Sequence, residues 1–66
     1  MKNTIKIQRA IKDLTQEELS NRIGVSRQTI NSIEKNRYIP STVLALKISR
    51  EFDKSVNEIF ELEEED

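Results

Sequence analysis

Apolar residues recur along the chain at the three- and four-residue spacing of helices that face a core. Glycine and proline occur only once each, so little interrupts this spacing. The pattern predicts an all-α fold of five helices, over residues 4–13, 16–23, 27–35, 41–52 and 56–60. The inward positions expected in or next to the first four helices are, in order, Ile7, Ala10, Ile11 and Leu14; Leu19 and Ile23; Ile30 and Ile33; and Leu44, Ala45, Ile48 and Phe52. The last helix carries Val56, Ile59 and Phe60.

Polar residues mark where three of these helices begin. Thr15 and Glu18 have the spacing of a capping box, in which the hydroxyl and the carboxylate each accept a backbone N–H of the first turn. Ser55 and Glu58 repeat that spacing before the last helix, and Ser26 is a favourable N-cap for residues 27–35. Each signal agrees with the helix start that the apolar spacing predicts.

The segment over residues 16–35 combines a short helix, a turn that contains glycine and a second helix with a polar outer face. Gly24 supplies the positive φ that ends the first helix, and Asn36, which tolerates the left-handed region, ends the second. Ser20 is small where the two helices would cross. This arrangement is typical of a helix-turn-helix unit, whereas a polar helix face taken alone is more often simply solvated.

Length and composition exclude several classes of protein. A chain of 66 residues forms one small domain, which we assign to residues 1–60, and buries only about 60% of its unfolded surface. The absence of Cys and His excludes disulfides and the usual zinc sites, and no cluster of residues suits catalysis. Since neither a membrane span nor a signal peptide is present, we expect a complete cytoplasmic protein without metal, cofactor or small-molecule ligand.

Charge is distributed unevenly along the chain, although the net charge is only −1. Residues 1–50 contain ten Lys and Arg and four Asp and Glu, whereas residues 51–66 contain one Lys and eight acids. A polyanion is bound by a local basic surface and not by the average charge of the molecule. The basic segment is therefore the candidate nucleic-acid-binding body, and residues 61–66 form an acidic tail, which we take as solubilising in preference to an interaction segment.

Four stretches of the sequence resemble the Cro/CI-like (XRE) family of helix-turn-helix proteins: QEELS (16–20), GVSRQTI (24–30), IEKN (33–36) and YIPS (38–41). The chain departs from that family's pattern at Thr42 and at Asp53-Lys54. The resemblance implies a compact five-helix domain like the DNA-binding domain of lambda repressor. Its members are mostly repressors, with some antitoxins.

The resemblance also implies which side chains read bases. Arg27, Gln28 and Ser32 fall where the family reads base edges in the major groove, and Asn31 is a further candidate. The chemistry agrees, because Arg can bind guanine and Gln can bind adenine through paired hydrogen bonds. We therefore expect double-stranded operator DNA as the partner.

Other positions match family residues that hold the DNA backbone or the fold. Arg9 and Glu34 match a salt bridge between the first and third helices; the alternative is an exposed pair worth less than ~1 kcal/mol. The positions expected at phosphates are Gln16, Lys35, Arg37 and Tyr38.

Two considerations predict a homodimer. One reading helix specifies too few base pairs to select a genomic site, and a small domain gains stability from association. Apolar positions on or near the C-terminal helices offer a two-fold contact, although scattered surface apolar residues are normal. We expect a two-fold interface through the last helix and the adjoining C-terminal residues, with reading helices about 34 Å apart on inverted half-sites. The apolar residues expected to form it are Val43, Leu46, Phe60 and Leu62.

The function expected from the sequence is transcriptional regulation, most simply repression at an inverted-repeat operator. The alternative is an antitoxin or partner-binding module that autoregulates its operon. We also expect residues 1–4 and 61–63 to pair as a small antiparallel ribbon.

Overall fold

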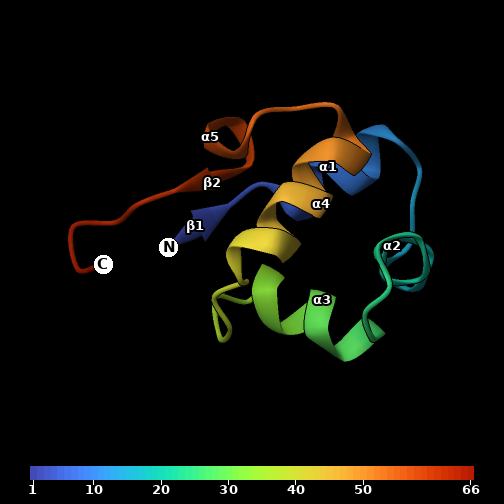
Figure 1. Ribbon diagram of the computed structural model, residues 1–66, viewed down its shortest axis with the longest axis horizontal. Helices are drawn as coiled ribbons and strands as arrows, with labels where there is room; N and C mark the ends of the chain where they lie inside the picture. Colours follow the sequence, from blue (N-terminus) through green and yellow to red (C-terminus); the bar gives the residue numbers. More distant parts are fainter.

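Five helices and a two-stranded ribbon surround one core in the computed structural model, which describes residues 1–66 (Figure 1). This confirms the predicted five-helix fold and its terminal ribbon, and no helix is long and apolar enough to cross a membrane. The elements in chain order are β1 (Lys2–Asn3), α1 (Ile5–Ile11), α2 (Gln16–Ile23), α3 (Arg27–Glu34), α4 (Thr42–Phe52), α5 (Val56–Ile59) and β2 (Phe60–Glu61).

The core takes apolar side chains from every helix, and α4 runs through its centre (Figure 1). Ile48 and Phe52 on α4 are almost fully buried, and burial of such a side chain stabilises the fold by about 1.5–3 kcal/mol. The full set is Ile5, Leu14, Leu19, Ile23, Ile30, Ile33, Leu44, Ile48, Phe52, Ile59 and Phe60.

The inward face predicted for α1 is wrong. Ile7 and Ile11 are 59% and 70% exposed, and Ala10 is exposed as well. The face that turns inward instead carries Ile5 and Arg9, four residues apart. Apolar spacing could not identify this face, because one of its members is a cation that is turned inward by an ion pair.

Local caps fix the ends of the other helices as the sequence indicates. The Thr15 hydroxyl accepts the N–H of Glu18 at 3.0 Å, and the Glu18 carboxylate accepts the N–H of Thr15 at 3.0 Å. Gly24 (φ 78°) and Asn36 (φ 60°) both adopt the left-handed region. Asp53, which departs from the family pattern, adopts the same region (φ 54°) and ends α4. An aspartate can therefore fill this position, because its short polar side chain tolerates the left-handed region.

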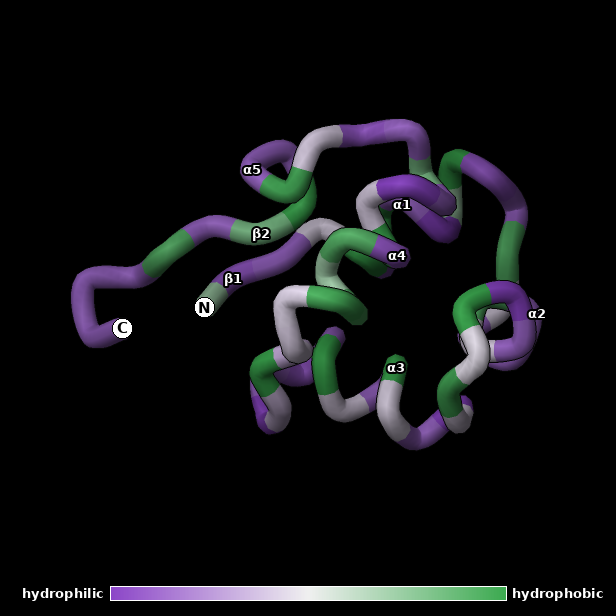
Figure 2. The backbone as a smooth tube through the Cα atoms, in the orientation of Figure 1, coloured by the Kyte–Doolittle hydropathy of each residue, from purple (hydrophilic) through white to green (hydrophobic).

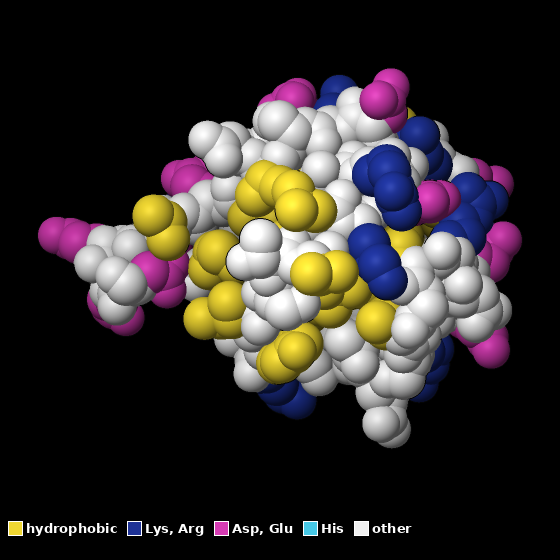
Figure 3. Space-filling view, viewed as in Figure 1, with side chains coloured by type: hydrophobic (Ala, Val, Ile, Leu, Met, Phe, Trp, Pro, Cys, Tyr) yellow, Lys and Arg dark blue, Asp and Glu magenta, His cyan; other side chains and the backbone are white.

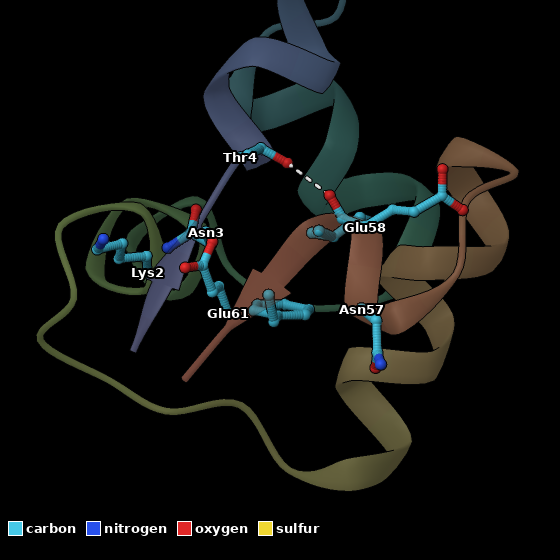
Figure 4. Close-up of a pocket in the computed structure, with 8 residues that line it drawn as sticks. Lys2, Asn3, Thr4, Asn57, Glu58 and Glu61 are labelled. Atoms are coloured by element: carbon cyan, nitrogen blue, oxygen red, sulfur yellow. Dashed lines mark hydrogen bonds between the residues drawn. The ribbon is translucent and has the colours of Figure 1, made fainter. Parts of the chain in front are cut away.

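The ribbon ties the two ends of the chain to α3 and α5. β1 and β2 pair antiparallel, with Asn3 opposite Phe60, so the ribbon begins one residue earlier in β2 than predicted. The Thr4 hydroxyl donates to the carbonyl of Glu58 at 3.3 Å (Figure 4). Asn3 Nδ2 donates to the carbonyl of Ile33 at 2.9 Å, which anchors β1 to the last turn of α3.

The acidic tail ends in a closed turn. The N–H of Asp66 donates to the carbonyl of Glu63 at 3.0 Å, and Asp66 Oδ2 accepts the N–H of Glu63 at 2.7 Å. The N-terminal ammonium lies 3.2 Å from Glu63 Oε1 and 3.1 Å from Asp66 Oδ2. The hydrogen bonds that the ammonium donates to these two carboxylates raise its pKa, the one to Asp66 most. The tail is largely hydrophilic and extends sideways from the body, beyond β2 (Figure 2).

Candidate nucleic-acid interface

The α2–α3 pair has the close packing that a helix-turn-helix unit needs. Ser20 on α2 is buried, and its hydroxyl donates to the carbonyl of Glu17 at 2.8 Å, so its polar atom is satisfied within its own helix. A Cβ placed on Gly24 would meet open space, so the turn requires glycine for its positive φ and not for lack of room. The Ser26 hydroxyl accepts the N–H of Thr29 at 3.1 Å and begins α3.

The polar face of α3 lies on one edge of the molecule, away from α5 (Figure 1). Arg27 and Gln28 occupy its first turn and are exposed. Asn31 and Ser32 lie one turn later and are half-buried. Lys35, predicted as the last residue of this helix, is instead its exposed C-cap. The four base-reading candidates therefore share one helix, and the first two are the most accessible.

An ion pair joins α1 to the end of α3. Arg9 Nε and Nη2 donate to the two carboxylate oxygens of Glu34 at 2.7 and 3.0 Å, and Nη1 donates to the carbonyl of Leu14 at 3.0 Å. The hydrogen bonds with Glu34 raise the pKa of the guanidinium. The two side chains are only 14% and 7% exposed, so this is a largely buried ion pair and not an exposed surface pair. Bidentate geometry of this kind fixes both partners in one orientation.

Gln16 extends this ion pair into a network that reaches the exposed face of α3. Its Nε2 lies 3.2 Å from both Asn31 Oδ1 and Glu34 Oε1. Its Oε1 accepts from Arg27 Nη1 at a longer 3.4 Å. The first residue of α2 is thereby linked to two of the base-reading candidates and to the ion pair between Arg9 and Glu34. No local sequence pattern signals this link, because it depends on how α2 lies across α3.

The loop after α3 presents two phosphate-binding candidates. The N–H of Arg37 donates to the carbonyl of Ser32 at 2.8 Å, and Asn3 Nδ2 lies 3.2 Å from Asn36 Oδ1. The side chains of Arg37 and Tyr38 are exposed. The loop is therefore held at its backbone, and its two longest polar side chains remain free to contact a ligand.

The four positions expected at a dimer interface divide into two groups. Val43 and Leu46 on α4 are 64% and 54% exposed, and Leu62 in the tail is exposed. Phe60 is only 7% exposed and belongs to the core, so the expectation of a free Phe60 surface is wrong. Phe60 lies in β2, opposite Asn3, and not in the last helix, and its side chain belongs to the core cluster.

A shallow groove of about 220 Å³ lies beside these residues. Leu46 on α4 and Ile39 before it line the groove, together with Met1 of the N-terminus and Phe60 of β2. Ile39 is exposed, and the sequence had placed it only within the family motif. We call Ile39, Val43 and Leu46 the apolar patch.

A family model described as helix-turn-helix matches residues 5–59. The chain belongs to the helix-turn-helix family. It is 48% identical over 66 residues, the full length of both chains, to an uncharacterized HTH-type transcriptional regulator of Methanocaldococcus jannaschii. It is also 48% identical over 65 residues, 98% of each chain, to the uncharacterized HTH-type transcriptional regulator YgzD of Bacillus subtilis.

Solved structures of helix-turn-helix proteins share its fold. The restriction-modification controller protein C.AhdI from Aeromonas hydrophila is 28% identical, with a TM-score of 0.78 over 85% of each chain. The clp gene regulator ClgR from Corynebacterium glutamicum is 26% identical, with a TM-score of 0.75 over 82% of this chain and 57% of that one. These likenesses confirm the resemblance to XRE regulators and identify a DNA-binding transcriptional regulator and not an enzyme.

Proposed function

We propose that this helix-turn-helix regulator is a cytoplasmic repressor that binds an inverted-repeat operator as a homodimer, with α3 of each protomer in the major groove. The observation that carries the proposal is the exposed first turn of α3, where Arg27 and Gln28 project from a helix held by a network of hydrogen bonds. A helix held in this way loses little conformational freedom when it enters the groove, which favours binding.

The side chains of α3 assign a reading chemistry to each position. Arg27 can donate two hydrogen bonds to guanine O6 and N7, and Gln28 can pair with adenine N6 and N7. Each such contact discriminates against a wrong base by about 1–3 kcal/mol. Asn31 and Ser32, which are less exposed, read the neighbouring bases in this proposal.

Four further side chains contact the DNA backbone in this proposal and carry no sequence information. Gln16 stands at the first residue of α2, where free backbone N–H groups attract a phosphate. The remaining three follow α3 and lie at or beyond its end: Lys35, Arg37 and Tyr38.

The proposed dimer forms through the apolar patch, together with Leu62 of the tail. Val43 and Leu46 are exposed apolar side chains one turn apart, and the groove next to Leu46 extends the apolar surface toward the ribbon. Two protomers double the number of bases read, and half-sites one helical turn apart require α3 helices about 34 Å apart. A dimer bound over a promoter excludes the polymerase, which gives repression without a ligand.

Selection of a preferred site from random duplexes, followed by titrations at several salt concentrations, tests the reading assignment. We expect Arg27→Ala and Gln28→Ala to relax preference at one or two base pairs. Lys35→Ala should weaken all sequences alike and lower the salt slope by about one. Lys6→Ala, an exposed cation on α1, is the matched control. If the Arg27 and Gln28 variants leave the ranking of sites unchanged, α3 is not the reading helix.

Sedimentation equilibrium tests the interface. We expect the double variant Val43→Gln, Leu46→Gln to remain folded and to sediment as a monomer at concentrations where the wild type is a dimer. The control Ile7→Gln, Ile11→Gln changes an equally exposed apolar pair on α1 and should leave the dimer intact. A wild-type monomer at 100 micromolar, or a dimer that only the α1 variant disrupts, would exclude the proposed interface.

A further inference from the structure

Two groups of charged side chains lie on opposite sides of the apolar patch and have no partner within the chain. Lys47 and Arg50 border Val43 and Leu46 around a shallow hollow on α4. Neither cation is within ion-pair distance of an acid; the nearby Arg22, in contrast, pairs with Glu51 at 2.9 Å. The basic edge of α4, as we call Lys47 and Arg50, is therefore an unpaired cationic rim.

The acidic counterpart is the tip of the tail turn. Glu64 and Glu65 are the two central residues of the turn that Glu63 and Asp66 close, and both are exposed. Neither carboxylate takes part in an ion pair, because the N-terminal ammonium binds the flanking Glu63 and Asp66. These contacts of the ammonium hold the turn in place and leave the carboxylates of its two central residues free.

Figure 3 shows how these groups are arranged on one face. Hydrophobic side chains occupy the middle of the face, acidic side chains project at its left end, and most of the Lys and Arg side chains in view lie at its upper right, with some acidic side chains among them. The order along α4 agrees: Leu46 lies between the hollow that includes the basic edge and the groove that reaches Met1 and Phe60 of the ribbon.

We propose that this face binds a second copy of the chain, with the tail turn of each protomer against the basic edge of α4 in the other. The inference rests on the proposed homodimer and gives it an orientation. Two copies that meet through one face are related by a two-fold axis lying in that face. An axis along the direction from tail to basic edge would place like charges together, whereas an axis across that direction pairs each tail with a basic edge.

The position of α3 selects the same axis independently. Both α3 helices must face one side of the dimer to contact the same DNA duplex. In the view of Figure 1, α3 lies along the lower edge and the tail extends to the left, whereas the C-terminal half of α4, which carries Lys47 and Arg50, lies to the right of the first turn of α4. A vertical axis keeps both α3 helices at the lower edge and exchanges left with right. The geometry that DNA binding requires is therefore the geometry that matches opposite charges.

The two parts of the interface have different roles. The apolar patch supplies affinity, since desolvation of apolar surface dominates association. Exposed ion pairs add little affinity, but like charges placed together are strongly unfavourable, so charge decides orientation. Because the N-terminal ammonium already holds the tail turn, less conformational entropy is lost when Glu64 and Glu65 contact the basic edge.

Charge reversal in full-length chains tests the arrangement. The tail variant carries Glu64→Lys and Glu65→Lys, and the α4 variant carries Lys47→Glu and Arg50→Glu. In a symmetric dimer each variant alone faces two repulsive contacts, and we expect each homodimer to weaken at least about tenfold at low salt. A mixture of the two variants restores both attractions, so the heterodimer should form with near wild-type affinity. The chain with all four changes should dimerise with itself.

Two controls keep the outcome interpretable. Reversal of Lys6 and Lys12, exposed cations on and just after α1, should leave dimerisation unchanged, and circular dichroism establishes that each variant is folded. If wild type, tail variant and α4 variant all dimerise equally and independently of salt, the charge pairing is wrong although the dimer stands. If the wild type is monomeric, the proposed dimer fails first. Weakened single variants without a restored heterodimer would also overturn the pairing.

Discussion

The α3 face and the apolar-patch face differ in how their charged and polar side chains are held. On the α3 face, Glu34 accepts from both Arg9 and Gln16, and Gln16 continues the network to Asn31 and Arg27. On the patch face, the basic edge of α4 and the central acids of the tail turn have no partner in the chain. One surface is linked by internal hydrogen bonds, and the other carries unpaired charge.

This difference indicates how each surface is used in the proposed function. DNA presents a fixed spacing of bases and phosphates, so a reading helix gains from side chains that are oriented before contact. A two-fold contact with a second copy supplies its own opposite charges, so unpaired groups on that surface find partners only in the assembly.

The largest expected effect comes from removing the centre of the linked network. Glu34→Ala leaves Arg9 half-buried without its partner, and we expect a loss of about 3 kcal/mol in the free energy of unfolding. Urea titration followed by circular dichroism measures it, with Glu17→Ala, an exposed acid on α2, as the control. The ranking of operator variants by affinity should change less than the free energy of unfolding does. An unchanged midpoint together with altered base preference would show that Glu34 acts in reading and not in architecture.

The turn that sets the α2–α3 geometry gives the next effect. Gly24→Ala places a Cβ in open space but in the left-handed region, which costs about 1–2 kcal/mol. Gly24→Asn should cost less, because Asn tolerates that region, and the pair of melting curves separates conformational strain from loss of contact. Equal destabilisation by Ala and Asn would contradict the conformational explanation.

A double-mutant cycle sharpens the comparison between the two faces. Gln16→Ala and Asn31→Ala should each weaken stability, with a coupling energy of about 0.5–1 kcal/mol from their shared hydrogen bond. The matched cycle between Lys47 and Glu64, made in the monomeric Val43→Gln, Leu46→Gln background, should give no coupling. A coupling in the second cycle would mean that the tail and α4 already interact within one protomer.

The smallest effect concerns pH. The backbone N–H of Thr15, with help from its hydroxyl, lowers the pKa of Glu18 below its usual 4.5. A lowered carboxyl pKa contributes stability that is complete above the ordinary value and is lost as pH falls through the folded value. Glu18→Gln should therefore flatten the fall in melting temperature below about pH 4.5, whereas Glu17→Gln should not. Parallel pH profiles for the two variants would contradict the capping box.

Sequence predicted most of the local structure because the relevant interactions are short-range. Thr15 and Glu18 cap α2, and Asn36 ends α3 in the left-handed region, as expected from residues within one turn. The base-reading candidates, predicted on one helix face, lie on one helix face, although their binding stays a prediction. The inward face of α1 was missed because Arg9 turns inward for an acid 25 residues away.

By itself, the sequence determined the number of helices, the starts of α2, α3 and α5 and the helix-turn-helix unit, since spacing, capping and left-handed residues act along the chain. Only the tertiary structure decided which exposed apolar and charged residues form one surface. Phe60 lies in β2 and belongs to the core, and the acidic tip of the tail and the basic edge of α4 lie on either side of one apolar patch. Such relations depend on the crossing of elements that are distant in sequence, which no local pattern encodes.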